Sequence, residues 1–161
     1  MNKINHNKGF TMMEVLVTIV ILSIGLLGLA GLQASSIRNN QSADHHSQAA
    51  MMIYDLSDRI RANRNGMAAG NYNAFNPMQV AACNTTAACT AFEMATNDMF
   101  EWNNNISNTL PNGSGTITGA GAGNLFTITV RWNDDRTGAT GTGCSGNSAV
   151  DLACLSMSFL L

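Results

Sequence analysis

Charged residues are scarce in this chain of 161 residues: only 11% are charged, and the net charge is -2. Proteins that bind nucleic acid or anionic membranes electrostatically carry basic patches, so this composition gives no support to a function of that kind. The chain also has only two prolines and few aromatic residues (6%), whereas glycine is frequent, with 15 residues. This composition favours a loop-rich β domain for the part of the chain that follows the apolar N-terminal region.

Side chains for catalysis and metal binding are also few. The three histidines all lie within the first 46 residues, and the sequence has neither a Gly-x-Ser-x-Gly elbow nor a phosphate-binding Gly-Lys-Ser/Thr loop. The later part of the chain offers only Glu93, Glu101 and scattered aspartates. Two of these, Asp134 and Asp135, are adjacent, but they suit a solvated turn better than a calcium site, which needs more ligands. We therefore expect no enzyme, no metal site and no cofactor.

Four cysteines fit an exported protein in an oxidising compartment, where disulfides persist. They allow three connectivities. We favour the pairs Cys83–Cys89 and Cys144–Cys154, because each closes a short local loop. Zinc binding is disfavoured, since neither pair has the short spacing of a zinc motif and the histidines are distant in sequence.

A long apolar run dominates the N-terminal part. In the 21 residues from Met12 to Leu32, Glu14 is the only charged residue. A membrane-spanning helix needs about 20 mostly apolar residues, so this run is long enough to span. A charge inside a bilayer costs about 2.5–3.5 kcal/mol, so we expect Glu14 to have a partner. The preceding segment holds Lys3 and Lys8 and no acid, which favours a cytoplasmic N-terminus.

The segment Lys8-Gly9-Phe10-Thr11-Met12-Met13-Glu14, with the apolar run after it, resembles the class III signal of type IV pilins and type II secretion pseudopilins. The resemblance implies that a prepilin peptidase cuts between Gly9 and Phe10 and that Phe10 becomes the N-methylated first residue. It also implies that Glu14 pairs with the N-terminal amine of a neighbouring subunit during assembly. The alternative is a plain signal-anchor helix with a stray acid, but a secretory signal places its cleavage site after the apolar run.

We expect three parts: a leader at residues 1–9, a long helix over residues 10–63 and a globular head over residues 64–161. Residues 12–32 would form the transmembrane part of the helix. Its glycines at positions 25, 28 and 31 fall near one helix face, where they permit close approach of another backbone or are ordinary membrane-helix glycines. Many major pilins have a proline where this chain has glycine 31, so the chain departs from the family pattern at this position.

The second half of the helix is amphipathic. Ala49, Ile53, Leu56 and Ile60 recur at helical spacing, which predicts a face that packs on the head. Arginines close this segment, where they suit the helix dipole, and Gly66 is the expected C-cap just beyond.

The head is expected to contain a second helix near residues 91–110, with Thr90 as N-cap and Glu93 completing a capping box. Its predicted core stripe is Phe92, Ala95, Met99, Trp102, Ile106 and Leu110. Alternating apolar residues predict strands at 115–119, 125–132 and 153–161. An antiparallel sheet of about three to five strands would then pack on the long helix. This α+β architecture matches the type IV pilin fold that the N-terminal resemblance implies.

Two further segments resemble PilV-type minor pilins: Asp58 to Arg64 followed by Gly70-Asn71-Tyr72, and Leu110-Pro111-Asn112-Gly113 after a helical tryptophan. The resemblance implies a minor pilin that primes or caps a type IV pilus and so supports adhesion, twitching motility or DNA uptake. Its implied partners are the prepilin peptidase, other minor pilins, the major pilin and the inner-membrane assembly platform. It would span the inner membrane once, with the head in the periplasm, and become extracellular in the assembled pilus.

Two alternatives stay open. A minor pseudopilin of a type II secretion system shares the same N-terminus. A membrane-tethered binding module would instead carry a receptor or DNA site on its head, but the arginine cluster at the helix end lacks the interleaved aromatic residues of a single-stranded nucleic-acid site.

Overall fold

The structure is a computed structural model and describes residues 10–85, 88–119 and 125–160. The expected leader, with Gly9, and the last residue of the final expected strand, Leu161, lie outside the described residues. The chain divides into two compact units, one ending at Gln41 and the other beginning at Ser42.

The first unit consists of the N-terminal part of α1 (Met12–Ala62), a helix of 51 residues. Its side chains are exposed, and this stretch is long and apolar enough to cross a membrane. Two hydroxyls inside it bond to the helix itself: Thr18 donates to the Val15 carbonyl at 2.8 Å, and Ser23 donates to the Ile19 carbonyl at 2.7 Å. Such back-bonding satisfies polar groups where a bilayer provides no water.

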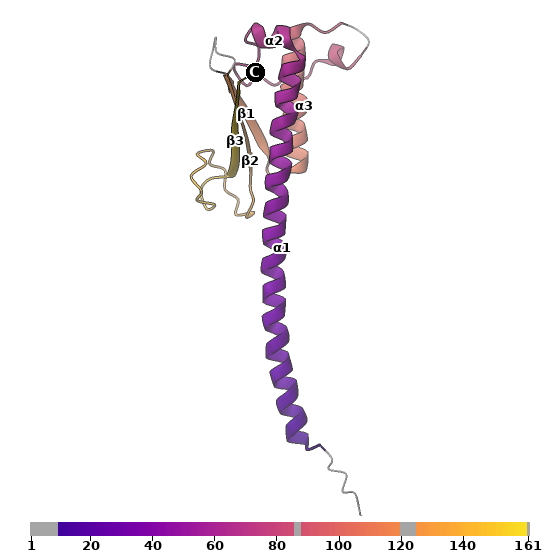
Figure 1. The fold of residues 1–161 in the computed structure, drawn as a ribbon, viewed down its shortest axis with the longest axis vertical. Coiled ribbons are helices and arrows are strands. Elements are labelled where there is room, and N and C mark those ends of the chain that lie inside the picture. Colours follow the sequence, from indigo (N-terminus) through magenta and orange to yellow (C-terminus); the bar gives the residue numbers. More distant parts are fainter. Residues whose placement is uncertain (1–9, 86–87, 120–124, 161) are drawn as a thin grey trace, which may run out of the picture. The chain divides into compact units, whose positions relative to one another are not determined.

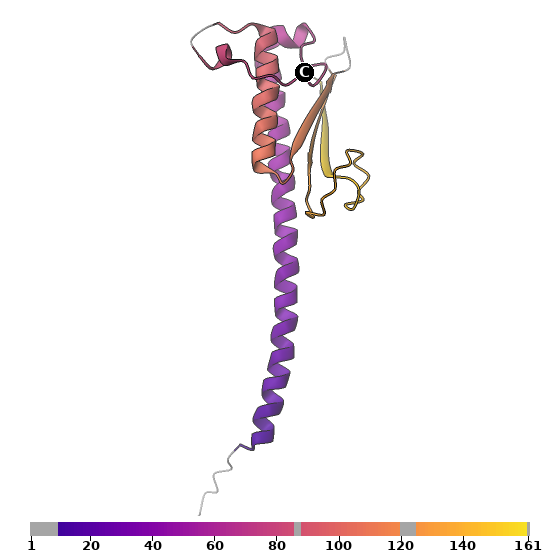
Figure 2. The ribbon, with the colours of Figure 1, turned by 180° about the vertical axis from the view of Figure 1, so that it is seen from behind.

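The second unit begins with the C-terminal part of α1 and continues through α2 (Arg64–Ala68), the 3₁₀ helix η1 (Ala81–Asn84) and α3 (Ala91–Thr109). Three strands follow: β1 (Ser114–Gly119), β2 (Leu125–Trp132) and β3 (Ala153–Leu160). They form an antiparallel sheet in the order β1-β2-β3. Figures 1 and 2 show α3 running alongside the C-terminal part of α1, with the sheet beside these helices. The predicted α+β pilin-like fold is confirmed.

The core of this unit forms where the predicted apolar faces meet. The α1 stripe of Ala49, Ile53, Leu56 and Ile60 is fully buried. The other buried apolar side chains include Ala95, Met99, Trp102 and Ile106 of α3 and Phe126, Ile128, Val130 and Trp132 of β2. The prediction is wrong only for Phe92, which lies in the first turn of α3 at the margin of the core and is 51% exposed.

The N-terminus of α3 has the predicted capping box. The Thr90 hydroxyl accepts the Glu93 N–H at 3.2 Å, and the Glu93 carboxylate accepts the Thr90 N–H at 2.9 Å. These two bonds satisfy helix N–H groups that have no partner within the helix, which fixes where α3 begins.

The predicted C-cap of the long helix is wrong, because Gly66 is buried inside α2 rather than following α1. Asn63 separates the two helices. Its side-chain oxygen accepts the Gly66 N–H at 3.1 Å, and its amide group donates to the Ala91 carbonyl at 2.8 Å and to the Tyr72 hydroxyl at 3.1 Å. Tertiary bonds from one asparagine therefore override the local glycine signal, and α2 is followed instead by Gly70, which has a positive φ of 74°.

Two disulfides join residues close in sequence. Cys83–Cys89 closes the loop between η1 and α3, and Cys144–Cys154 ties the loop after β2 to the start of β3. These are the two pairings that the sequence favours, because each joins cysteines close in sequence.

Candidate assembly segment and head-domain surfaces

The candidate assembly segment is the start of α1. Thr11 precedes the helix, and its hydroxyl accepts the Glu14 N–H at 3.3 Å while its carbonyl accepts the same N–H at 3.0 Å. Glu14 is therefore the third helical residue, with its carboxylate in the first turn, where a negative charge is favourable. Phe10 lies four residues earlier, before the helix, and is 84% exposed.

The Glu14 side chain is exposed. Among residues 10–85, 88–119 and 125–160, the structure contains no ion pair that involves Glu14. The chain therefore positions this acid by a helix cap and does not neutralise it within the part described.

The glycines of the span are also not explained by contacts within the chain. A Cβ atom built on Gly25, Gly28 or Gly31 meets nothing within 4 Å in the described structure. Each glycine weakens a helix by about 1 kcal/mol relative to alanine. Packing inside the described part of the chain gives no reason for this cost.

The arginine cluster at the end of α1 serves the head itself. Arg59 pairs with Asp55 on its own helix at 3.1 Å and reaches Asp98 at 3.3 Å and Glu101 at 3.1 Å on α3. The buried Tyr72 hydroxyl donates to Asp98 at 2.6 Å, and burial together with this bond raises the pKa of Tyr72 well above its usual value. The sequence indicated only a helix-dipole role, whereas the structure shows that Arg59 links α1 to α3.

Asp134 is not the solvated turn residue that the sequence indicated. It accepts hydrogen bonds from the Ser42 hydroxyl, from His45 Nδ1 at 2.8 Å and from Trp132 Nε1 at 3.0 Å. The three residue types are those of a hydrolase triad, but the order differs, because here the carboxylate lies between serine and histidine. The cluster therefore fastens the turn after β2 to α1 and does not activate Ser42.

Asp134 makes the stability of the head depend on pH. Burial alone would raise the pKa of Asp134, but the bonds from Ser42, His45 and Trp132 outweigh it and leave the pKa below its usual value. A carboxyl group of this kind stabilises the fold above its unfolded-state pKa, about 3.9, and the contribution is lost as pH falls through the lower folded-state value. We expect Asp134→Asn to lower the free energy of unfolding by about 1–2 kcal/mol near pH 6 and by much less near pH 3.

Urea denaturation of the full chain in detergent, followed by tryptophan fluorescence from pH 3 to pH 7, measures this difference. The exposed neighbour Asp135 provides the matched control, and Asp135→Asn is expected to stay within about 0.5 kcal/mol of the parent. A loss of equal size at every pH would contradict the assignment of the effect to the ionised Asp134.

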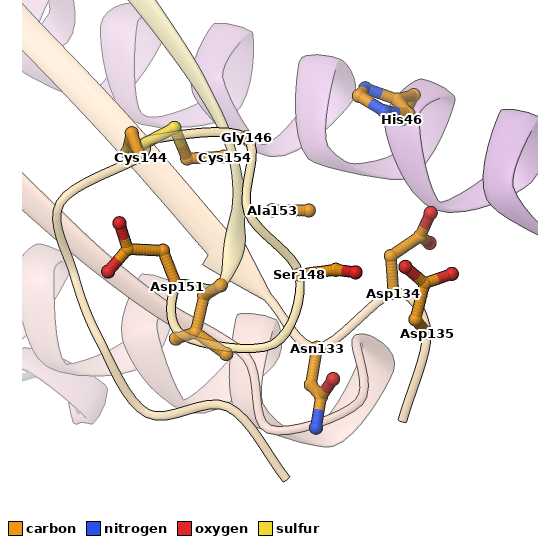
Figure 3. A pocket seen from close by; sticks show the side chains of 11 residues that line it. His46, Asn133, Asp134, Asp135, Cys144, Gly146, Ser148, Asp151, Ala153 and Cys154 are labelled. Carbon is orange, nitrogen blue, oxygen red and sulfur yellow. A yellow bond between two sulfur atoms is a disulfide. The ribbon is translucent and has the colours of Figure 1, made fainter. Parts of the chain in front are cut away.

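A pocket of about 280 Å³ adjoins this cluster and includes Asp134, Asp135 and Asp151 in its lining. Figure 3 shows Asp151 on the far side of the pocket from the other two aspartates, beside the Cys144–Cys154 disulfide. Its carboxylate accepts the N–H groups of Gly143 and Ser145, each at 3.1 Å, and bonds from Ser145 and Gly143 lower the pKa of Asp151. Within the described ranges, no three His, Cys, Asp or Glu side chains gather as a metal site requires.

Comparison with known families gives two adjoining matches. Residues 4–30 match the prokaryotic N-terminal methylation motif, and residues 31–100 match the family described as type IV pilin Tt1218. No curated protein and no solved structure matches the chain significantly. The first match covers the predicted processing signal and most of the apolar span, and the second covers the rest of α1 and half of α3. Together with the α+β fold, these matches support a type IV pilin that carries a prepilin methylation signal.

Proposed function

We propose that the chain is a minor pilin of the PilV type, which joins a type IV pilus as a priming or tip subunit. The observation that carries the proposal is the exposed Glu14 carboxylate in the first turn of an exposed apolar helix. The exposed apolar helix is unfavourable for a subunit alone in water, and the Glu14 carboxylate becomes unfavourable when this helix enters apolar surroundings without a partner. An assembly that supplies both apolar neighbours and a countercharge removes both costs. The PilV assignment itself rests on the residues around Arg59 and after Trp102 that resemble that branch.

In the proposed route, a prepilin peptidase cuts between Gly9 and Phe10, and the new amine of Phe10 is methylated. The amine and the Glu14 carboxylate are each costly in apolar surroundings, and pairing them between subunits offsets both charges. The span holds the subunit in the inner membrane, with the head in the periplasm, until the assembly platform transfers it into the filament. There, the apolar faces of neighbouring major and minor pilins replace lipid around the helix.

Mass spectrometry of sheared pili tests this proposal. We expect the chain to be found there with methylated Phe10 as its first residue. Gly9→Leu is expected to block cleavage, so the chain keeps its nine-residue leader, remains in the membrane fraction and is absent from pili. Asn7→Ala, two residues away, serves as the control and should be processed normally. Recovery of Gly9→Leu chains in pili with the leader attached would contradict the proposed cleavage site.

A minor pseudopilin of a type II secretion system is the second candidate, because the N-terminal motif is common to both classes. Deletion of the gene separates them. Loss of surface pili with normal secretion supports the pilus subunit, whereas loss of exoprotein secretion with intact pili supports the pseudopilin.

A further inference from the structure

The two outer edges of the sheet differ in whether another segment of the chain bonds to them. The outer edge of β1 is covered: Ala74 forms a bridge with Thr118, and the Gly119 N–H donates to the Asn73 carbonyl at 3.0 Å. In the described part of the chain, β3 pairs with β2 alone. The outer edge of β3 therefore leaves a row of backbone N–H and C=O groups without a strand partner.

The sequence of β3 has none of the features that usually protect such an edge, and the preceding loop is tied to the strand at Cys154, its second residue. Exposed edge strands are normally short, bulged, or interrupted by lysine or proline, because a bare edge pairs readily with other chains. The eight residues from Ala153 to Leu160 include no charged residue, no proline and no glycine. An unprotected edge of this length indicates that it is covered in the working assembly.

The apolar side of β3 is incompletely buried. Leu155, Met157 and Phe159 point to the core but remain half-buried, whereas their partners on β2 are at most 1% exposed. Tyr54 of α1 contacts the Phe159 ring at a centroid distance of 5.8 Å and is still 53% exposed. The core therefore continues to the β3 edge and stops there with its apolar side chains partly open to solvent.

We propose that the β3 edge accepts a fourth strand in trans, supplied by an uncharged extended segment of a different pilus subunit. This inference rests on the proposed function. The occupant is a strand because only an extended backbone matches alternating N–H and C=O groups along an edge. The occupant is uncharged along its paired stretch because β3 carries no charge and the half-buried side chains of Leu155, Met157 and Phe159 are apolar.

A second copy of this chain fits less well. It would offer the same β3 edge, since its own β1 edge is covered at Thr118 and Gly119. Pairing of β3 with β3 is a two-fold contact that closes a dimer, whereas a filament grows through contacts between different surfaces. The partner strand therefore comes from another kind of subunit.

Met157→Lys tests the proposal, because Met157 is half-buried beside the free edge. In a subunit alone, a lysine there extends its ammonium group past the edge into water. A docked strand would cover that charge. We expect the variant to form both disulfides but to reach sheared pili at about one tenth of the parental amount, a change of about 1.4 kcal/mol.

Two controls accompany this variant. Met157→Leu keeps the position apolar, and Thr118→Lys places the same charge on the covered edge of the sheet. Both are expected to be incorporated within about twofold of the parent, a change of less than about 0.5 kcal/mol. Incorporation of Met157→Lys at the parental level would overturn the edge proposal, whereas absence of the parent itself from pili would overturn the proposed function.

If the Met157→Lys variant fails to form its disulfides, photocrosslinking provides a second test of whether another subunit docks at the β3 edge. A photoreactive amino acid replaces the exposed Ser158 of β3 in full-length chains assembled into pili, with the same residue at Thr118 for comparison. The expected product joins position 158 to an extended, uncharged segment of another kind of pilus subunit. Crosslinks only to a second copy, or no more product than from position 118, would overturn the proposal.

Discussion

Glu14→Gln chains are expected to be cleaved and methylated normally but to reach sheared pili about a hundredfold less than the parent. Glutamine has nearly the shape of glutamate and also suits the third position of a capped helix, so the start of α1 is kept apart from a helix-dipole contribution of about 0.3–1 kcal/mol. What is lost is the negative charge that, in the proposed assembly, offsets the amine of a neighbouring subunit. An unpaired charge in apolar surroundings costs about 2.5–3.5 kcal/mol, which corresponds to about two orders of magnitude. Quantitative mass spectrometry of membranes and pili measures both steps.

Two variants separate charge pairing from helix capping. Glu14→Asp keeps the carboxylate and should recover much of the incorporation. Thr11→Ala removes the hydroxyl that accepts the Glu14 N–H but leaves the charge in place. Its cost is that of a lost N-cap, about 1 kcal/mol, and it should lower incorporation far less than Glu14→Gln. If Thr11→Ala and Glu14→Gln were equally defective, the acid would act through the helix and not through a partner.

Trp102→Ala is expected to lower the free energy of unfolding of the head by about 3–5 kcal/mol. The indole of Trp102 is fully buried, and its N–H donates to the Met52 carbonyl at 2.8 Å. The ring also fills the space above Gly115, where a Cβ atom would lie 2.3 Å from it. The change therefore leaves a cavity at the junction of α1, α3 and β1 and removes the additional hydrogen bond to the Met52 carbonyl. Urea denaturation of the full chain, followed by the fluorescence of Trp132, measures the loss.

Phe92→Ala is the matched control, since it truncates another aromatic residue of α3. Phe92 is 51% exposed, so its truncation should change the free energy of unfolding by less than about 1 kcal/mol. The sequence alone predicts similar effects for the two residues, because both belong to the same helical stripe. Similar losses for the two variants would show that the margin of the core, and not its centre, holds α3 in place.

Regular periodicity made most of the fold predictable. The spacing of Ala49, Ile53, Leu56 and Ile60 identified the buried face of α1, and alternation from Phe126 to Trp132 identified the buried face of β2. The pair Thr90 and Glu93 placed the start of α3 to the residue. In each case the signal depends on neighbours within a few residues, which the sequence contains in full.

Features that depend on distant contacts were not predictable in this way. The bonds from Ser42 and His45 to Asp134 join residues about ninety positions apart, and nothing near Asp134 distinguishes it from a solvated turn. The role of Asn63 likewise depends on Tyr72 and Ala91, which only the folded chain brings together. The free edge of β3 required the strand order, because a strand's sequence does not say on which side its neighbour lies.

In the candidate assembly segment, by contrast, the sequence identifies the candidate residues and the structure adds one contact. Order and spacing define the motif, so the sequence alone identifies Gly9, Phe10 and Glu14 as its candidate residues. What the structure adds is the Thr11 cap, which fixes the Glu14 position in the first turn of α1. The sequence pattern Thr-x-x-Glu at residues 11–14 indicates such a cap, because it is a common start of a helix.

The loop that precedes β3 carries a consequence for the durability of the protein. A stretch rich in glycine, serine and threonine is normally where a protease cuts first. Here the Asp151 carboxylate accepts hydrogen bonds from the N–H groups of Gly143 and Ser145. The Cys144–Cys154 disulfide joins the two ends of the segment that lies between these cysteines. A cut inside the bridged segment would release no fragment, because both new ends stay joined through sulfur. A chain nicked in this segment would therefore keep its last strand covalently joined to the rest of the protein.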